Sequence, residues 1–448
     1  MKTKLLLLRL LSDYGMIFVL IGLCVFFSVA TWQDQYPSGA EAARQVAGQI
    51  RSKFGNGVRV MIAARPDAED TIFATTLARE VELAGGFVGA NVKGEPSDAR
   101  EALSKLGRGG AKIDVIATSQ AAAGWLVFTK VDTEYPMLGR ITQLRPHAYR
   151  GSNFLKSENL LNIANQIAVI AIIAVGMTVV IVSGGIDLSV GSLIALSAVV
   201  TSRVIRDYCG GVEAGIGGLF FAGLVGVLAC GGIGAFSGAV VTLCGIPSFI
   251  VTLATMLVAS GLAYLLSAGQ SIYQVPENFV WLGRGADLFG LPNAVLLVIL
   301  LYAAAHVLMT FMKLGRYLYA VGGNAEAARL SGVPVNGVVT FAFVVSGLLA
   351  GLGGVVMASQ LKSGSPTYGG MYELYVIAAV VVGGTSLRGG SGKMLGTLIG
   401  ALIIAVIQNG MNLCGVESYT QKVVLGLVIL AAVLLDRLRQ RLWNGPTN

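Results

Sequence analysis

The stretch VGMTVVIVSGGIDLSVGSLIAL, residues 175–196, decides the fold class of this chain. An apolar run ends at the glycine pair Gly184 and Gly185, and a second apolar run begins a few residues later. Apolar runs of about 20 residues that are joined by short polar turns are typical of helices that cross a bilayer. The stretch therefore predicts a polytopic α-helical membrane protein.

A second stretch repeats this pattern near the C-terminus. Residues 182–192 (VSGGIDLSVGS) and 381–391 (VVGGTSLRGGS) align without a gap at V-x-G-G-x-x-L-x-x-G-S. The shared glycines are Gly184, Gly185 and Gly191 in the first copy and Gly383, Gly384 and Gly390 in the second. Both copies lie between apolar runs, which favours a parallel internal repeat of the kind found in one class of transporters. Chance coincidence of Gly-rich membrane segments is the alternative.

The composition of the whole chain agrees with a membrane protein. Of the 448 residues, 54% are hydrophobic and 12% are charged, and the charged share is about half that of a soluble domain. The low charge and the irregular glycine spacing exclude disordered and collagen-like classes. The five cysteines form no CxxC or Cys/His cluster, so neither a disulfide framework nor a metal site is expected.

About ten transmembrane helices are expected from the apolar runs. The predicted spans are residues 14–32, 161–183, 188–206, 215–243, 248–268, 293–312, 337–360, 372–384, 394–413 and 418–436. The run at 372–384 is too short to cross a ~30 Å hydrocarbon core as a straight helix. We expect it to be tilted or broken and covered by its neighbours.

Basic residues orient these spans. With both termini in the cytoplasm, the inner segments carry eleven Lys and Arg residues and the short outer segments carry six, as the positive-inside rule requires. This predicts a cytoplasmic N-terminus (1–13), a first span (14–32), an extracytoplasmic segment (33–152), a membrane domain (153–436) and a cytoplasmic tail (437–448). A cleaved signal peptide with the site Ser28-Val29-Ala30 is the alternative for the first span.

Residues 32–150 have the composition of a soluble domain. They hold 28 charged residues in 119, whereas the other 329 residues also hold 28. Strands are predicted at 57–64, 87–92 and 112–119, with helices at 39–53, at 68–83 and, capped by Ser97, at 97–106. This alternation predicts a small parallel α/β domain inserted into the membrane protein.

Polar residues inside the spans are candidates for a solute pathway. Asn165, Gln166, Asp187, Gln408 and Asn409 could line such a pathway, because amides donate and accept hydrogen bonds without a fixed charge. Thr178 and Asn412 share this setting. The alternative is hydrogen bonding between helices, and for Asp187 it is capping of the next helix.

Residues 313–336 form a polar interruption on the predicted cytoplasmic side. Within them, residues 324–330 suit a short helix that is capped by Asn324 and ended by Gly332 and Pro334. A short Ala-rich helix suits close docking on another protein. A plain connecting loop is the alternative.

Four motifs resemble the permease subunits of the ribose-type carbohydrate ABC importers. They are residues 175–196, GIPSFIVTLATM (245–256), GRYLYAVGGNAEAARLSGV (315–333) and YVIAAVVVGGTSLRGGSGKMLGT (375–397). The resemblance implies a bacterial inner-membrane protein that imports a monosaccharide. Its partners would be a cytoplasmic ATPase, a second permease copy or a homologous permease, and an extracytoplasmic binding protein. The ATPase-coupling residues would be Arg316, Gly323, Asn324, Ala325, Glu326, Ala328, Arg329 and Gly332.

The chain itself is predicted to lack enzyme activity, a metal and a cofactor. The nearest match to a phosphate-binding loop, at Gly392-Lys393, has Met394 where Ser or Thr should bind Mg²⁺. His147 and His306 are the only histidines and lie far apart in the sequence. The net charge of +8 is explained by topology, so no nucleic-acid partner is expected.

The insertion departs from the family pattern. GVRVMIAARPDAED (57–70) and IDVIATSQAAAGW (113–125) resemble one lobe of a periplasmic sugar-binding protein. Arg65, Asp67, Ser119 and Gln120 lie at strand ends, where such sheets bind ligands, although capping of helices and turns is the alternative. We expect the domain to dock or gate the binding protein. Other possible functions are a permease for an autoinducer, a nucleoside or a branched amino acid, and a membrane solute receptor.

Overall fold

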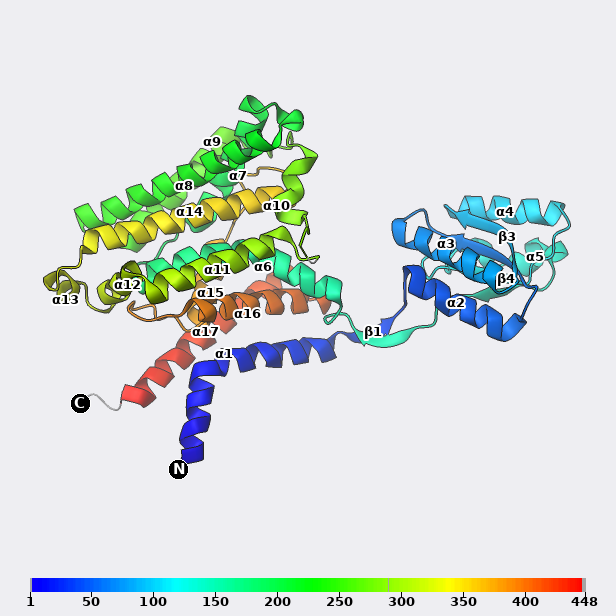
Figure 1. Ribbon diagram of the computed structural model, residues 1–448, viewed down its shortest axis with the longest axis horizontal. Coiled ribbons are helices and arrows are strands. Elements are labelled where there is room, and N and C mark those ends of the chain that lie inside the picture. Colours follow the sequence, from blue (N-terminus) through cyan, green and yellow to red (C-terminus); the bar gives the residue numbers. More distant parts are fainter. Residues whose placement is uncertain (1, 289, 445–448) are drawn as a thin grey trace. The chain divides into compact units, whose positions relative to one another are not determined.

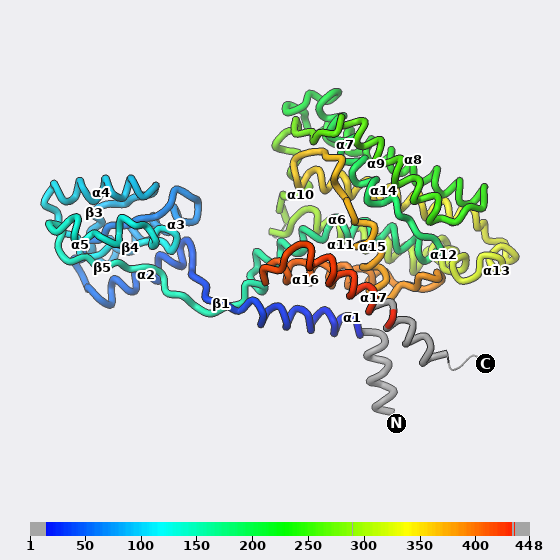
Figure 2. Tube along the Cα trace, turned by 180° about the vertical axis from the view of Figure 1, so that it is seen from behind, coloured from blue at the N-terminus to red at the C-terminus, as the bar shows by residue number. Residues whose placement is uncertain are grey.

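The chain divides into two compact units. The computed structural model describes the backbone of residues 2–288 and 290–444, and the side chains of 15–288, 290–431 and 434. The helical unit consists of Met1–Thr31 and Asn153–Asn448, and the inserted unit consists of Trp32–Ser152. Figures 1 and 2 show the two units from opposite sides.

Helices make up the helical unit. They are α1 (Lys2–Ala30), α6 (Ser157–Val182), α7 (Val190–Tyr208), α8 (Ile216–Cys244), α9 (Ser248–Ser267), α10 (Trp281–Arg284), α11 (Asn293–Phe311), α12 (Lys313–Gly323), α13 (Ala325–Leu330), α14 (Val335–Leu361), α15 (Tyr372–Val382), α16 (Met394–Leu413) and α17 (Ser418–Asn444).

Six of the described helices are long and apolar enough to cross a membrane, namely α6, α8, α9, α11, α14 and α16. Shorter apolar stretches lie at Gly15–Ala30, Tyr372–Val382 and Ser418–Ala431. Each of the ten predicted spans overlaps a helix, but α7 carries Arg203, Arg206 and Asp207 in its last turns, which shortens its apolar part. The first helix ends at Ala30, so the predicted end of that span at Trp32 is wrong.

The core of the helical unit forms around α6 and α14. Nearly all side chains of α6 from Ile167 to Val182 are buried, and α14 packs against α6, α7 and α8. Glycines permit the close approach of α8 to α14: a Cβ at Gly238 would lie 2.8 Å from the Thr340 Cα. Packing of this kind, with small residues at the contact, is how helices associate in a membrane.

The inserted unit is a three-layer α/β domain. Strands β3 (Phe87–Lys93), β2 (Arg59–Ala64), β4 (Val115–Thr118) and β5 (Thr142–Leu144) form a parallel sheet in that order. Alternate residues of β2 face opposite layers: Val60 and Ile62 belong to the apolar cluster under α2 and α3, and Met61 belongs to the cluster under α4. The helices are α2 (Gly39–Phe54), α3 (Ala68–Leu83), α4 (Pro96–Arg108) and the short α5 (Val131–Glu134).

Helix α4 begins earlier than expected. Its first residue is Pro96 and its N-cap is Glu95, whose backbone N–H donates to Asp98 Oδ2 at 2.8 Å. The predicted cap at Ser97 is therefore wrong. Proline is favoured in the first turn because its missing N–H would be unpaired there, and this signal explains the earlier start.

A two-stranded ribbon closes the inserted unit. Strand β1 (Trp32–Gln35) pairs antiparallel with β6 (Tyr149–Ser152), so that Gln35 lies opposite Tyr149. The ribbon contains the first and last residues of this unit. Both connections to the helical unit therefore leave from one end of a paired element rather than from two loose linkers.

The two repeat turns share one backbone geometry, but not in the register of the ungapped alignment. Helix α6 ends at Val182 and is followed by Gly184 at φ 90°, whereas α15 ends at Val382 and is followed by Gly384 at φ 89°. Gly184 therefore corresponds to Gly384 and not, as the alignment has it, to Gly383. The predicted pairing is wrong by one residue because each turn contains two adjacent glycines and one alone needs the positive φ.

Candidate functional site

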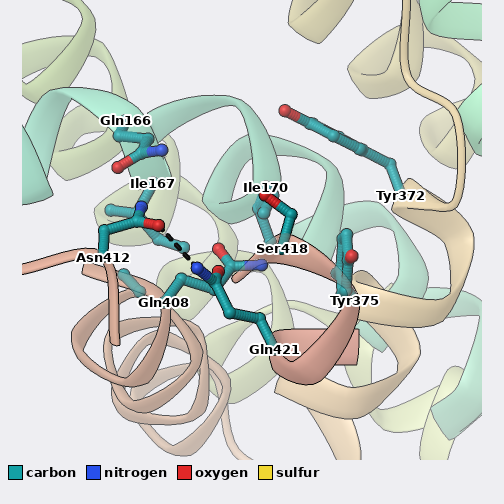
Figure 3. Close-up of a pocket in the computed structure, with 10 residues that line it drawn as sticks. Gln166, Ile167, Ile170, Tyr372, Tyr375, Gln408, Asn412, Ser418 and Gln421 are labelled. Carbon is teal, nitrogen blue, oxygen red and sulfur yellow. Dashed lines mark hydrogen bonds between the residues drawn. The ribbon is translucent and has the colours of Figure 1, made fainter. Parts of the chain in front are cut away.

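A polar cavity lies among α6, α15, α16 and α17. Its volume is about 250 Å³, and Figure 3 shows the side chains that surround it. The lining residues are Gln166, Ile167, Ile170, Tyr372, Tyr375, Ala405, Gln408, Asn412, Ser418 and Gln421. The cavity thus brings together Gln166 and Gln408, which come from two helices far apart in the sequence.

The lining chemistry suits an uncharged solute with several hydroxyl groups. Four of the ten lining side chains are amides, which both donate and accept hydrogen bonds, and none of the ten is charged. The rings of Tyr372 and Tyr375 lie 6.2 Å apart between centroids and offer apolar faces beside their hydroxyls. Gln421 Nε2 donates to Asn412 Oδ1 at 2.7 Å, which orders both amides at the cavity wall (Figure 3).

The sequence could not have identified all of these residues. Tyr372 and Tyr375 begin the short helix α15, and Ser418 and Gln421 begin α17. Helix starts carry polar residues for capping in any case, so such residues look ordinary in the sequence. Their common feature, a single cavity, exists only after four helices pack.

Two predicted pathway residues lie outside the cavity lining. Asn409 exchanges hydrogen bonds with Asn159, at 2.9 Å and 3.1 Å between amide atoms. Asn165 accepts from Gln360 Nε2 at its side-chain oxygen Oδ1, at 3.3 Å, and at its backbone oxygen, at 3.0 Å. Both residues therefore join helices, as the alternative interpretation of intramembrane amides proposes.

Asp187 also lies away from the cavity lining. Its side chain is buried; Oδ1 accepts from the backbone N–H of Ser189 at 2.9 Å and from the Ser189 hydroxyl at 2.6 Å. Oδ2 accepts from the Ser346 hydroxyl at 2.7 Å. The carboxylate thus fixes the residue that precedes α7 and joins this turn to α14.

Residues 313–336 form two short helices rather than one. The predicted helix at 324–330 is confirmed as α13, and Asn324 caps it by accepting the Ala327 N–H at 2.9 Å. Helix α12 was not predicted, because three of its eleven residues are glycines, which disfavour helix. We name α12 and α13 together the coupling segment, after the role that the sequence predicts for them.

The coupling segment presents an exposed surface. On α13, Glu326 and Arg329 are exposed and lie 3.5 Å apart between charged atoms, while Ala328 is buried against the protein. Leu330 is 82% exposed. Arg316 on α12, Gly323, Ala325 and Gly332 are also accessible. An exposed leucine beside a paired charge suits a protein–protein contact.

The strand-end residues of the inserted unit serve the local structure. Asp67 caps α3 by accepting the Asp70 N–H at 2.8 Å. Asp70 Oδ2 accepts from the Arg65 N–H at 2.9 Å and from the Ser119 hydroxyl at 2.6 Å. Gln120 Oε1 is buried without a hydrogen-bond partner in the part of the chain that the structure describes. A helix cap and a turn thus account for the side chains of Asp67 and Ser119, two of the four predicted strand-end residues.

Among the described residues, no group of three or more His, Cys, Asp and Glu side chains could hold a metal ion.

The match to a known protein family falls on the helical unit. Residues 159–433 match the family described as "Branched-chain amino acid transport system / permease component". The ribose import permease protein of Escherichia coli (strain K12) is 41% identical over 330 residues, which cover 72% of this chain and 100% of that protein.

Two further relatives come from the same organism. The D-allose transport system permease protein is 38% identical over 64% of this chain and 85% of its own length. The L-arabinose transport system permease protein is 40% identical over the same two shares. No solved structure matches the chain significantly.

Proposed function

The chain belongs to the family described as "Branched-chain amino acid transport system / permease component", and we propose that it is the membrane permease subunit of an ATP-binding cassette importer for a monosaccharide. It is a multi-pass protein of the bacterial inner membrane and a transporter subunit rather than an enzyme. The observation that carries the sugar assignment is the alignment with a ribose permease over that protein's entire length, at 41% identity.

Its partners supply energy and substrate. Permeases of this kind work with an ATPase on a separate chain and with a binding protein. We further propose that two permease subunits, either two copies of this chain or one copy with a homologous permease, enclose the solute pathway. ATP-driven closure of the ATPases would shift the two subunits between outward-open and inward-open states, each with its own affinity for the solute.

Contacts within the helical unit support the predicted topology. Helix α6 has 26 residues and is about 39 Å long, enough to cross a bilayer. At its start, the Phe154 N–H donates to Thr31 Oγ1, where the inserted unit is attached. At its end, Val182 contacts Gly322 of the coupling segment. The attachment points of residues 32–152 and the coupling segment thus lie at opposite ends of α6, which agrees with an extracytoplasmic insertion.

In the proposed topology, the cavity belongs to the outer half of the membrane domain, because it lies nearer the start of α6 than its end. Gln166 and Ile170 are about ten residues from the start of α6, or roughly 15 Å along its axis. A sugar that is released by a binding protein would meet these amides early on its way inward. We propose that the cavity is a low-affinity part of the pathway.

The inserted unit is proposed to dock or gate the binding protein. Its 121 residues, 32–152, are 27% of the chain, and the ribose permease of Escherichia coli leaves 28% of this chain unaligned. The unit is thus about as large as the part of this chain that the alignment leaves out. A permease function carried by the rest of the chain leaves the unit free for a role in substrate delivery.

Uptake measurements test the proposed substrate class. The permease is reconstituted in vesicles with its ATPase and binding protein, and ATP is supplied on the side of the membrane where the ATPase lies. We expect at least one of ribose, allose and arabinose to be transported across the membrane in an ATP-dependent manner. Leucine is the discriminating control, because the family description names branched-chain amino acids. The ten uncharged lining residues offer no ionic partner for its ammonium and carboxylate groups. Uptake of leucine without uptake of any sugar would overturn the assignment.

A further inference from the structure

Two of the repeat glycines, Gly184 and Gly390, meet the coupling segment at one point in the fold. Gly322 in the last turn of α12 packs against the backbone of Val182, which ends α6, and against Gly390 in the loop before α16. The Gly390 N–H donates to the Val182 carbonyl oxygen at 2.9 Å. We name these three contact points, with Gly184 and Gly389 beside them, the glycine junction.

No side chain fits inside the glycine junction. A Cβ at Gly322 would overlap the Val182 carbonyl oxygen and would lie 2.6 Å from the Gly390 nitrogen. A Cβ at Gly389 would lie 2.8 Å from the Gly322 oxygen and 3.0 Å from the Gly184 Cα. Gly389 and Gly390 also have φ angles of 84° and 71°, which disfavour other residues. At the glycine junction itself, the three segments therefore touch through their backbones.

When one segment of such a backbone contact moves, the segment packed against it must move by nearly the same amount. A contact between flexible side chains can absorb a small movement by changing rotamers, whereas close-packed main chain cannot. A shift of the last turn of α12 must therefore move Val182 and Gly390 or break the hydrogen bond between them.

Both segments that touch α12 lead to walls of the cavity. Val182 ends α6, which supplies Gln166, and Gly390 precedes α16, which supplies Gln408. The Tyr319 hydroxyl of α12 donates to the Gly392 carbonyl oxygen at 2.8 Å and so adds a second attachment to the loop before α16. In the turn that follows α6, the Asp187 side chain accepts a hydrogen bond from the Ser346 hydroxyl on α14.

We propose that the glycine junction is the connection through which movement of the coupling segment reaches both repeat turns, with Gly322 as its positioning residue. The proposal rests on the proposed function, since it takes the coupling segment as the ATPase contact. It gives Gly184, Gly389 and Gly390 a purpose: they let the two turns and the coupling segment approach each other closely. The two cavity helices α6 and α16 then respond to the ATPase together.

The substitution Gly322→Ala tests the proposal in the assembled transporter, with ATPase and binding protein present. We expect the amount of sugar imported per ATP hydrolysed to fall about tenfold, within the usual range of coupling between distant sites. Gly337→Ala is the matched control, because a Cβ at Gly337 has no heavy atom within 4 Å. The control should keep the wild-type ratio. A wild-type ratio in Gly322→Ala would overturn the proposal.

Two further measurements test the proposal even if the Gly322→Ala permease does not assemble with its partners. Tyr319→Phe removes one hydroxyl and its hydrogen bond to Gly392, so a smaller fall in the same ratio, about twofold to fivefold, is expected. In the wild type, amide exchange in segments 180–186 and 386–392 should change together when a non-hydrolysable ATP analogue binds. Independent changes, or no change in either segment, would contradict the proposal. Failure of the wild type to import any sugar would instead count against the proposed function.

Discussion

Gln408 and Asn409 are neighbours in the sequence with different roles in the structure. Gln408 lines the cavity, whereas Asn409 points to Asn159 and exchanges two hydrogen bonds with it. On a helix, consecutive residues are separated by about 100° around the axis, so they face different partners. The sequence predicted both residues to line one pathway. Only the packing of α16 shows that Gln408 lines the cavity and that Asn409 joins two helices.

The cavity predicts that Gln408→Leu weakens sugar transport without disturbing the fold. The substitution keeps a similar volume and removes an amide, with its two N–H donors and its acceptor oxygen, from the cavity. A neutral hydrogen bond contributes about 1 kcal/mol, so the apparent KM for sugar should rise about fivefold while the maximal rate changes little. Initial uptake rates over a range of sugar–binding protein concentrations measure this.

Asn409→Ala serves as the contrasting variant. It removes both hydrogen bonds with Asn159. The free energy of unfolding of the purified protein should therefore fall by roughly 1 kcal/mol or more. Its KM for sugar should stay close to the wild-type value. Equal KM values for Gln408→Leu and the wild type would show that the cavity is not part of the pathway.

Local capping rules predicted some elements well and others badly. Asn324 caps α13 as its sequence indicates, because that signal depends on a few adjacent residues. Helix α12 escaped prediction since its glycines disfavour a helix, yet Gly315 and Gly322 allow close packing on Met309 and Val182. The repeat was found but misaligned by one residue, because identity of letters does not reveal which glycine carries the positive φ.

The β1–β6 ribbon permits a clean removal of the inserted unit. Gln35 and Tyr149 are opposite each other at the end of the ribbon, so replacing residues 36–148 by Asn-Gly would close it with a two-residue hairpin turn. The helical unit keeps its own core and should still insert and bind the ATPase. If the unit docks the binding protein, the affinity of the shortened transporter for that protein should fall about tenfold or more.

Measuring that affinity in nanodiscs, beside uptake at saturating binding protein, separates docking from folding. A docking role predicts weaker binding with uptake that recovers at high concentration. A gating role predicts unchanged binding with altered uptake. Unchanged affinity together with unchanged uptake would leave the inserted unit without a role in substrate delivery, and the proposal would fall.

At the scale of the whole molecule, the sequence predicted the membrane character and the soluble insertion. Both depend on averages over many residues, as the contrast between 28 charged residues in 119 and 28 in 329 shows, and averages survive errors at single positions. The cavity and the glycine junction depend on contacts between segments far apart in the chain. Val182 and Gly390 belong to different copies of the repeat and Gly322 belongs to neither, so only the folded structure reveals their contact.

The central claim is that this chain imports a sugar by using the ATPase of a partner. The most direct test is ATP hydrolysis by the reconstituted complex of permease, ATPase and binding protein, with and without each sugar. We predict that the binding protein loaded with its sugar stimulates hydrolysis above the level seen with the empty binding protein. The permease should be required for this stimulation. Equal hydrolysis with and without every pentose and hexose tested, in a complex of confirmed composition, would contradict the account.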